Sequence, residues 1–239
     1  MRVLPPSASR GSAEALVQGL NLHVNAGETL CIVGESGSGK SLTSLSIMGL
    51  LPAESLEVTS GSIELEGRNL LTLNKGQMRA LRASQLAMVF QEPMTALNPV
   101  HKVGAQVEEV LKLHSTMSAS QRRTRVLEML EAVHLPDIQR IYDSYPHQLS
   151  GGQRQRIVIA MALILQPRLL IADEPTTALD VTTQKQILSL IRELQEKHGT
   201  AVIFITHDFG VVAEIADRIL VMNKGQVVET GTRDQILAK

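Results

Sequence analysis

The stretch that decides the fold reads GESGSGKS and runs from Gly34 to Ser41. It matches the pattern G-x-x-x-x-G-K-[S/T], which binds phosphate when it lies between a strand and a helix. Both neighbours are present, since the apolar run Glu28–Val33 precedes it and the helix-like segment Lys40–Leu50 follows it. Glycines in such a loop let backbone N–H groups converge on a phosphate, and the helix N-terminus adds partial positive charge. The stretch predicts a phosphate-binding loop and disfavours the alternative, an ordinary glycine-rich turn.

Two side chains of this loop have chemical roles. We expect Lys40 to reach the β- and γ-phosphates of a nucleotide and the hydroxyl of Ser41 to bind Mg²⁺. The predicted nucleotide-binding set is Gly34, Glu35, Ser36, Gly37, Ser38, Gly39, Lys40, Ser41 and Leu42.

A second motif, LLIADEP from Leu169 to Pro175, is an apolar strand that ends in adjacent carboxylates. Beside a phosphate-binding loop, Asp173 is expected to face Mg²⁺ and Glu174 to polarise a water for in-line attack on the γ-phosphorus. An Asp-Glu pair alone is more often a solvated loop or a helix cap. The phosphate-binding loop in the same chain favours the catalytic interpretation.

Three further polar residues lie at or near strand ends. Gln91 ends LAMVFQ, His207 ends AVIFITH, and Asp180 lies in TTALD shortly after the carboxylate pair. Parallel strands deliver their carboxyl ends to one edge of a sheet, where α/β proteins bind ligands. We therefore expect these residues near the phosphates, although each alone would more often be structural or exposed.

The segment LSGGQ, Leu149–Gln153, resembles a second anion-binding loop. Ser150 and the backbone N–H groups after it precede a helix that is expected to start at about Gln153. One nucleotide needs only one such loop, and LSGGQ lies too far along the chain to share the phosphate of Lys40. Its role needs a separate explanation.

Composition limits the class of protein. A length of 239 residues suits one large domain or a core with a subdomain. The net charge of −1 argues against a generic nucleic-acid or anionic-membrane binder, and 2% aromatic residues leave few platforms for stacking bases. The single Cys31 in an apolar run predicts a buried inert thiol and a reducing compartment. The longest apolar run, Ile157–Leu165, is too short to span a bilayer, and no export signal is visible, so we expect a soluble cytoplasmic protein.

Apolar strands alternate with helices along the chain, which predicts a parallel sheet covered on both faces. Amphipathic segments from Val103 to Tyr142 predict a helical insert, in which Ser118 or Ser120 caps a helix. The other expected strands are Ser62–Leu65, Leu86–Gln91, Leu169–Asp173, Ala201–His207 and two short strands after them, and the other expected helices are Lys75–Ala83, one from LSGGQ through Leu165, Thr183–His198 and a short one after His207.

The ordered set GESGSGKS, Gln91, LSGGQ, LLIADEP, ALD at Ala178–Asp180 and His207 resembles the nucleotide-binding subunit of ATP-binding cassette (ABC) transporters over nearly the whole chain. The resemblance implies an α/β fold with a RecA-like P-loop NTPase core, a mostly parallel sheet, an N-terminal β subdomain and an inserted α-helical subdomain. Residues 1–239 would form a single ABC ATPase domain, with the core at about 1–91 and 168–239 and the helical signature subdomain at about 92–167.

The same resemblance implies an ATPase that uses ATP and Mg²⁺. The implied catalytic residues are Glu174, His207 and Gln91, where Gln91 senses the γ-phosphate and Mg²⁺ and His207 contacts the γ-phosphate. The implied metal-binding residues are Ser41, Gln91 and Asp173. In this family LSGGQ completes the site of a second, head-to-tail cassette, so Ser150, Gly151, Gly152 and Gln153 would act on ATP bound by a partner, identical or different. Asp180 would belong to the loop that runs across to that partner.

A narrower resemblance comes from MVFQEPMTALNP, VGAQVEEVL, SYPHQLSGGQRQR and ADEPTTALDV. These are similar to ATPases of the dipeptide, oligopeptide, nickel, glutathione and opine importer group. The resemblance implies ATP-driven import of a small solute, peptide-like or related, through a separate permease contacted near Glu92–Pro99. It also implies a periplasmic or extracellular solute-binding protein, no nucleic acid, and a peripheral location on the cytoplasmic face of the inner (plasma) membrane. The alternatives are a separate-chain exporter cassette and a soluble non-transport ABC ATPase.

Two features depart from the family pattern. Family members usually stack adenine on an aromatic residue near the N-terminus, whereas the first Phe or Tyr here is Phe90 and the corresponding place falls near Val3–Ser7. Relaxed base selectivity is therefore expected. The segment Arg2–Leu4 resembles the tail of a strand, and the importer group commonly continues past Lys239, so we expect a trimmed chain or one half of a fused tandem cassette.

Overall fold

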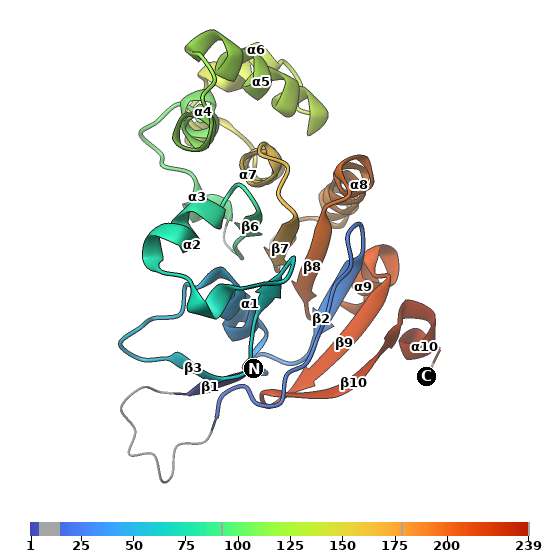
Figure 1. Ribbon diagram of the computed structural model, residues 1–239. Coiled ribbons are helices and arrows are strands. Elements are labelled where there is room, and N and C mark those ends of the chain that lie inside the picture. The colour runs from blue at the N-terminus through green and yellow to red at the C-terminus, as the bar shows by residue number, and fades with distance from the viewer. Residues whose placement is uncertain (5–14, 92, 178, 239) are drawn as a thin grey trace. The chain divides into compact units, whose positions relative to one another are not determined.

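The computed structural model describes residues 1–4, 15–91, 93–177 and 179–238 (Figure 1). The chain divides into two compact units. We call the first, Met1–Arg82 with Val202–Lys239, the P-loop unit, and the second, Ala83–Ala201, the signature unit. The predicted subdomain boundaries at about residues 92 and 167 stay a prediction.

The P-loop unit contains four neighbouring strands in the order β10 (Gln226–Thr232), β9 (Arg218–Asn223), β2 (Thr29–Val33) and β8 (Ala201–Thr206). Strand β2 is parallel to both β8 and β9, and β10 is antiparallel to β9. All residues of β2 and β8 are buried, which explains why both are unbroken apolar runs instead of alternating ones.

Among its described residues, the P-loop unit has four α-helices: α1 (Lys40–Met48), α2 (Lys75–Leu81), α9 (Phe209–Ile215) and α10 (Arg233–Leu237). Helix α9 packs on β2, and α10 packs on β10 and α9. Helix α1 ends at Met48, and Gly49 after it caps the helix with a left-handed backbone (φ 61°).

Small antiparallel sheets make up the N-terminal β part. Strand β1 (Arg2–Leu4) pairs with β3 (Glu57–Ser60), β4 (Glu64–Leu65) pairs with β5 (Arg68–Asn69), and a 3-10 helix follows at Leu70–Thr72. The predicted strand Ser62–Leu65 is thus too long. Glu66 and Gly67, both with positive φ (49° and 78°), turn the chain after Leu65, where the strand was predicted to end. The partner strand β5 ends at Asn69, where the 3-10 helix begins, so only two residue pairs form and the strand starts at Glu64.

The signature unit is built around two parallel strands, β6 (Leu86–Val89) and β7 (Leu169–Asp173). Helix α7 (Gly151–Leu163) packs on β6 and lies next to α3 (Pro93–Ala96) and α8 (Val181–His198). On the other side of α7, α4 (Val103–His114), α5 (Ala119–Ala132) and α6 (Ile138–Asp143) pack on one another (Figure 1). These three helices are the predicted helical insert.

Most predicted elements of this unit are confirmed, with shifts at their ends. Ser118 caps α5 through a capping box with Gln121, so the first of the two predicted caps is the right one. Strand β6 ends at Val89, two residues before its predicted end, and α8 starts at Val181, two residues earlier than predicted. No helix within the described residues is long and apolar enough to cross a bilayer.

Candidate nucleotide-binding site

The loop GESGSGKS connects β2 to α1, as predicted. Two of its glycines lie where no other residue fits. A Cβ on Gly34 (φ 153°) would lie 2.1 Å from the carbonyl oxygen of Met222, and one on Gly39 (φ 98°) would lie 2.8 Å from Cγ2 of Val17. Gly37, in contrast, faces open space. Packing against neighbouring segments therefore fixes the loop at Gly34 and Gly39, whereas the middle of the loop, at Gly37, is open.

Lys40 directs its ammonium group into the loop. Its Nζ donates hydrogen bonds to the carbonyl oxygens of Gly34 (2.8 Å) and Glu35 (2.9 Å), and the residue is only 6% exposed. The positive charge is thus positioned by the loop backbone. An anion at the loop N–H groups would meet this charge with little rearrangement of the long side chain.

The loop also presents polar groups that suit a phosphate chain. Helix α1 begins at Lys40, and Gly39 before it has no side chain that can cap the first-turn N–H groups. The hydroxyl of Ser38 is buried and has no hydrogen-bond partner within the part of the chain that the structure describes. Ser41 at the start of α1 is exposed. These unsatisfied donors and the Lys40 charge fit nucleoside phosphates.

His207 lies at the same edge of the P-loop unit's sheet as the phosphate-binding loop. In the parallel pair β2 and β8, Val33 is opposite Thr206, so Gly34 and His207 are the next residues along two adjacent strands. The hydroxyl of Thr206 accepts a hydrogen bond from the N–H of Asp208 (3.0 Å), which orders the turn that carries the exposed His207. Sequence reasoning expected this arrangement.

The β9–β10 hairpin supports the phosphate-binding loop, a contact that sequence reasoning missed. The N–H of Gly225, in the turn between β9 and β10, donates to the carbonyl oxygen of Ser38 (3.0 Å), and its own carbonyl accepts from the N–H of Gln18 (2.9 Å). A Cβ on Gly225 (φ 76°) would lie 2.1 Å from the carbonyl oxygen of Leu16. The sequence Asn-Lys-Gly signals a tight turn, but nothing in it signals what the turn touches.

In the signature unit, Gln91 and Glu174 meet. Strands β6 and β7 are parallel, and Val89 lies opposite Ala172, so Gln91 and Glu174 each stand two residues beyond a matched pair. Nε2 of Gln91 donates to Oε2 of Glu174 at 3.2 Å. Asp173, one residue earlier, is 6% exposed at the end of β7. Two of the three predicted catalytic residues are thus in direct contact.

Thr177 is a neighbour of Glu174 that sequence reasoning missed. Its hydroxyl donates to Oε2 of Glu174 at 3.1 Å, and its N–H donates to the carbonyl oxygen of Glu174 at 3.2 Å. Glu174 itself has a left-handed backbone, with φ of 47°. The only signal in the sequence was a short hydroxyl side chain three residues after a carboxylate, which is typical of many turns.

The segment LSGGQ forms the start of α7. Ser150 caps the helix: its Oγ accepts from the N–H of Gln153 (3.2 Å), and its N–H donates to Oε1 of Gln153 (3.0 Å). A Cβ on Gly151 would meet open space, whereas one on Gly152 would lie 2.8 Å from Cγ2 of Thr183. The helix starts two residues before its predicted start at about Gln153.

Asp180 lies beside this segment through Thr183. Asp180 caps α8 by accepting from the N–H of Thr183 (2.9 Å) and from its hydroxyl (2.7 Å). These hydrogen bonds, from the Thr183 hydroxyl first and its N–H second, hold the pKa of the exposed Asp180 carboxyl below its ordinary value. Because the side chain of Thr183 lies next to Gly152, the starts of α7 and α8 lie side by side, and the structure brings LSGGQ and Asp180 together.

The predicted metal-binding residues divide between the units: Ser41 is in the P-loop unit, and Gln91 and Asp173 are in the signature unit. Among the described residues no group of three His, Cys, Asp or Glu side chains is arranged to hold a metal ion. Mg²⁺ in phosphate sites usually binds one or two carboxylates together with phosphate oxygens and water, and the Ser41 hydroxyl in one unit and the Asp173 carboxylate in the other are each oxygen ligands of that kind. Cys31 is buried as predicted, and burial, aided by Asp217, raises the pKa of its thiol.

Some predicted residues lie outside the described part of the chain: Glu92 in the predicted permease contact, Ala178, and residues 5–7 of the predicted adenine region. Within the rest of the permease contact, Leu97 is 2% exposed while Asn98 and Pro99 are exposed. The side chain of Gln106 fixes this segment by accepting from the N–H of Asn98 (2.9 Å) and donating to its carbonyl oxygen (3.0 Å).

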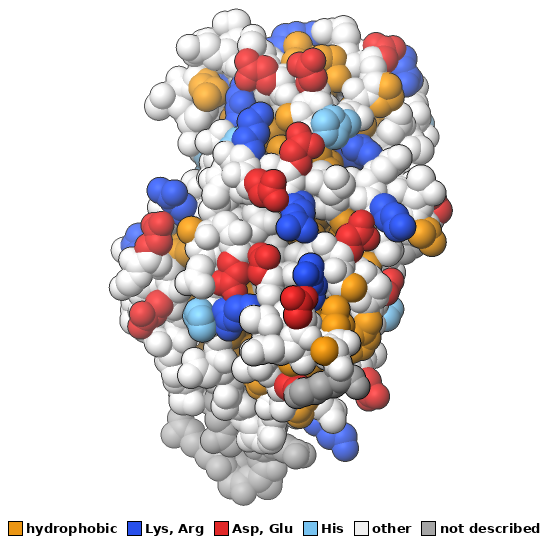
Figure 2. Space-filling view, turned by 90° about the vertical axis from the view of Figure 1, so that its right-hand side faces the viewer, with side chains coloured by type: hydrophobic (Ala, Val, Ile, Leu, Met, Phe, Trp, Pro, Cys, Tyr) orange, Lys and Arg blue, Asp and Glu red, His pale blue; other side chains and the backbone are white. Residues whose placement is uncertain are grey.

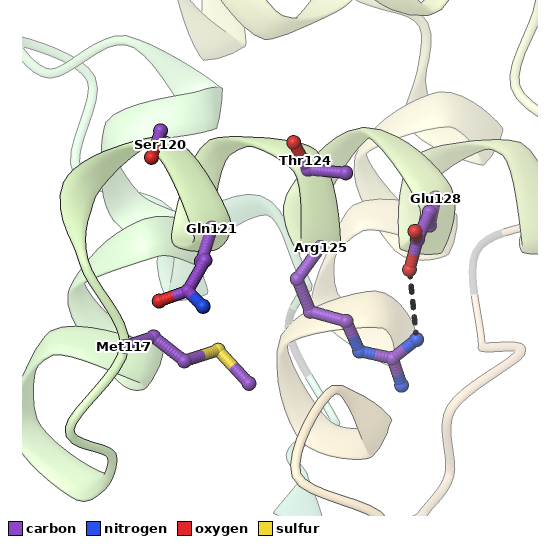
Figure 3. A pocket seen from close by; sticks show the side chains of 6 residues that line it. All are labelled: Met117, Ser120, Gln121, Thr124, Arg125 and Glu128. Carbon is purple, nitrogen blue, oxygen red and sulfur yellow. Dashed lines mark hydrogen bonds and ion pairs between the residues drawn. The ribbon is translucent and has the colours of Figure 1, made fainter.

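One cavity among the described residues lies away from the predicted site residues. An open cavity of about 350 Å³ lies along one side of α5 and contains none of the predicted site residues; Arg125 and Glu128 form an ion pair in it (Figure 3). Basic and acidic side chains are interspersed on the face shown in Figure 2. That face therefore lacks the one-signed stripe that nucleic-acid binders present.

Fold and site together define a P-loop nucleotide-binding protein of the α/β class. The profile of one family, described as ABC transporter, matches residues 17–177. The chain belongs to the ABC transporter family.

Similar proteins agree with this assignment. The chain is 52% identical to the oligopeptide transport ATP-binding protein OppD of Bacillus subtilis (95% of this chain, 63% of that protein) and 54% identical to the dipeptide transport ATP-binding protein DppD of the same organism (95% and 68%). It is 53% identical to the glutathione import ATP-binding protein GsiA of Escherichia coli (93% and 36%). The chain thus spans about two thirds or less of the length of these relatives.

Solved structures show the same fold. A dimeric, post-hydrolysis structure of the ATP-binding cassette MJ0796 bound to ADP and Pi matches with a TM-score of 0.80 at 32% identity, over 98% of this chain and 99% of that one. The protein cbiO1 from Clostridium perfringens, described as part of the ABC transporter complex cbiONQ, matches with a TM-score of 0.82 at 27% identity, over 99% of this chain and 90% of that one.

Proposed function

We propose that this chain is the ATP-hydrolysing subunit that powers import of a small solute, peptide-like or related, through a separate membrane permease. The observation that carries the ATPase part is the phosphate-binding loop with the Lys40 ammonium directed into it, 2.8 Å from the Gly34 carbonyl. The importer part is supported by relatives at about half identity whose names are those of peptide transport and glutathione import ATP-binding proteins.

The reaction is the hydrolysis of ATP to ADP and phosphate. Lys40 and the loop N–H groups bind the β- and γ-phosphates, and His207 contacts the γ-phosphate. Glu174 accepts a proton from water as the water oxygen forms a bond to the γ-phosphorus; the bond from that phosphorus to the bridging oxygen breaks, and ADP leaves. Glu174 then releases the proton to solvent. Bound Mg²⁺ would neutralise phosphate charge, and Ser41, Gln91 and Asp173 would hold it.

A second cassette, identical or different, completes the site in this proposal. LSGGQ of one chain acts on the γ-phosphate bound by the loop of the other, and Asp180 lies at the same surface. Three observations support this. The start of α7 is open at Gly151, LSGGQ and Asp180 lie together through Thr183, and the similar cassette MJ0796 is a dimer in its solved structure.

The proposed import function also implies partners at the membrane. We infer that permease subunits bind near Glu92–Pro99, that a periplasmic or extracellular solute-binding protein belongs to the system, and that the chain is peripheral to the cytoplasmic face of the inner (plasma) membrane. The exposed Asn98 and Pro99, fixed by Gln106, offer a preformed contact surface.

Pairing is tested by the ATPase rate per chain as a function of protein concentration, measured for the chain alone and with any second cassette encoded beside it. We expect the rate per chain to rise with concentration and then saturate. A rate per chain that does not depend on concentration would refute the shared site.

Import is tested by reconstituting the chain in vesicles together with the permease that is encoded beside it. We expect ATP hydrolysis to be stimulated by the loaded solute-binding protein on the opposite side of the membrane, and the solute to accumulate on the same side as the ATPase. Movement of solute toward the other side would indicate the alternative, a separate-chain exporter. An ATPase that neither binds nor responds to the permease would indicate the other alternative, a soluble non-transport cassette.

A further inference from the structure

We propose that Thr177 is a positioning residue, whose hydroxyl holds the Glu174 carboxylate in the orientation that accepts the proton of the attacking water. The proposal rests on the role of Glu174 as the base under the proposed function. The interpretation of the motifs gave the side chain of Thr177 no role.

The backbone of Glu174 needs an external constraint. Its φ of 47° is in the left-handed region, which is unfavourable for a residue with a Cβ. Such a conformation persists only where neighbouring interactions impose it, and it occurs often at functional sites. Here the N–H of Thr177 donates to the carbonyl oxygen of Glu174 at 3.2 Å and closes the turn directly after β7.

The side chain of Thr177 constrains the same residue a second time. Its Oγ1 donates to Oε2 of Glu174 at 3.1 Å. Gln91 donates to that same oxygen from the end of the neighbouring strand at 3.2 Å. Two donors on one oxygen restrict the rotation of the Glu174 carboxylate about its bond to Cγ. Without them, this torsion angle would have a broad distribution.

The two donors differ in how they depend on the reaction. Gln91 is expected to turn to the γ-phosphate and Mg²⁺ when ATP is bound, and its contact with Glu174 would then be lost. Thr177 is three residues from Glu174 in the same turn, so its contact needs no other part of the chain to stay in place. Of these two donors, the Thr177 hydroxyl is the one that stays in place while the proton is transferred.

Only a short hydroxyl side chain can make this contact. Valine has nearly the same shape as threonine but no donor, and serine keeps the donor without the methyl group. Thr177 is exposed, so neither replacement creates a core cavity. Thr177→Val therefore removes the hydrogen bond, and Thr177→Ser is its matched control.

The test measures kcat and KM for ATP with the full-length chain at saturating protein concentration. We expect Thr177→Val to lower kcat roughly fivefold, as for one hydrogen bond to a charged group in a partly exposed site, while KM changes less than about twofold. Thr177→Ser should stay within about twofold of the unchanged chain, and Thr177→Ala should behave like Thr177→Val. Glu174→Gln with and without Thr177→Val should show the same residual rate, because the hydroxyl acts only through the carboxylate.

Three results would overturn the proposal: an unchanged kcat in both Thr177→Val and Thr177→Ala, an equal loss in Thr177→Ser, or a further loss when Thr177→Val is added to Glu174→Gln. The last two would mean that residue 177 acts on folding or nucleotide binding. Failure of the proposed function looks different, since Glu174→Gln would then retain normal turnover whatever residue 177 is.

Discussion

The turn between β9 and β10 is expected to be essential for the shape of the phosphate-binding loop, and Gly225→Ala tests this. The added Cβ would lie 2.1 Å from the carbonyl oxygen of Leu16 and 2.8 Å from its carbonyl carbon. Both are backbone atoms, which cannot rotate away as a flexible side chain would. The turn must therefore move, and the hydrogen bonds from Gly225 to Ser38 (3.0 Å) and from Gln18 to Gly225 (2.9 Å) must break or lengthen.

The free energy of unfolding can be worked from these contacts. An alanine at φ 76° costs about 1 kcal/mol because the left-handed backbone disfavours a Cβ. Losing two buried backbone hydrogen bonds adds about 2 kcal/mol. Displacing the packed turn adds roughly 1 kcal/mol or more. We expect Gly225→Ala to lower the free energy of unfolding by about 4 kcal/mol in total.

Gly67→Ala is the matched control, since Gly67 has nearly the same φ (78°) but nothing within 4 Å of the added Cβ. It should cost only about 1 kcal/mol, the backbone contribution alone. Urea unfolding of the two variants gives both values, and titration with a nucleotide gives the affinity, which should fall for Gly225→Ala only. Equal stability losses in the two variants would refute the idea that the turn supports the loop through Ser38.

The remaining predictions concern binding, pairing and pH. Lys40→Ala should lower ATP affinity at least ~tenfold in a calorimetric titration, because the charged donor for the phosphates is lost; unchanged affinity would contradict its role. Ser150→Arg should leave ATP affinity intact but abolish ATP-driven dimerisation in sedimentation experiments, and a dimer that persists would contradict the reading of LSGGQ. Burial alone would raise the pKa of Glu28, but hydrogen bonds from Asn25 and Arg218 outweigh it and bring the pKa below 4.5, so its stabilisation is present above that pH and is lost on acidification. Glu28→Gln should therefore be less stable than the unchanged chain at pH 7 and lose less stability between pH 5 and 3, measured by urea unfolding.

The sequence predicted most of the elements that carry the site. The apolar runs of β2, β7 and β8 and the loop between β2 and α1 were expected at nearly their observed bounds, because buried parallel strands leave unbroken apolar runs. The helical insert was expected from its amphipathic spacing. Local features with a local signal were thus predictable.

Contacts between distant segments were not predictable in the same way. The turn at Gly225 supports Ser38, which lies 187 residues earlier in the chain, and the sequence of the turn says nothing about its partner. The contact of Gln91 with Glu174 follows from the register of β6 on β7, which backbone pairing decides. Thr177 was missed because its role depends on the left-handed backbone of Glu174, a conformation that the sequence ADEPTTALD does not reveal.

Under the proposed function, Glu174 is the base of an ATP-hydrolysing site. Its most direct test compares ATP affinity and ATP turnover in the unchanged chain and in Glu174→Gln, which keeps the size of the side chain and removes its ability to accept the proton. We expect affinity to change little and turnover to fall at least ~100-fold, the usual contribution of a general base. Turnover close to that of the unchanged chain in Glu174→Gln would contradict the role of Glu174 as the base.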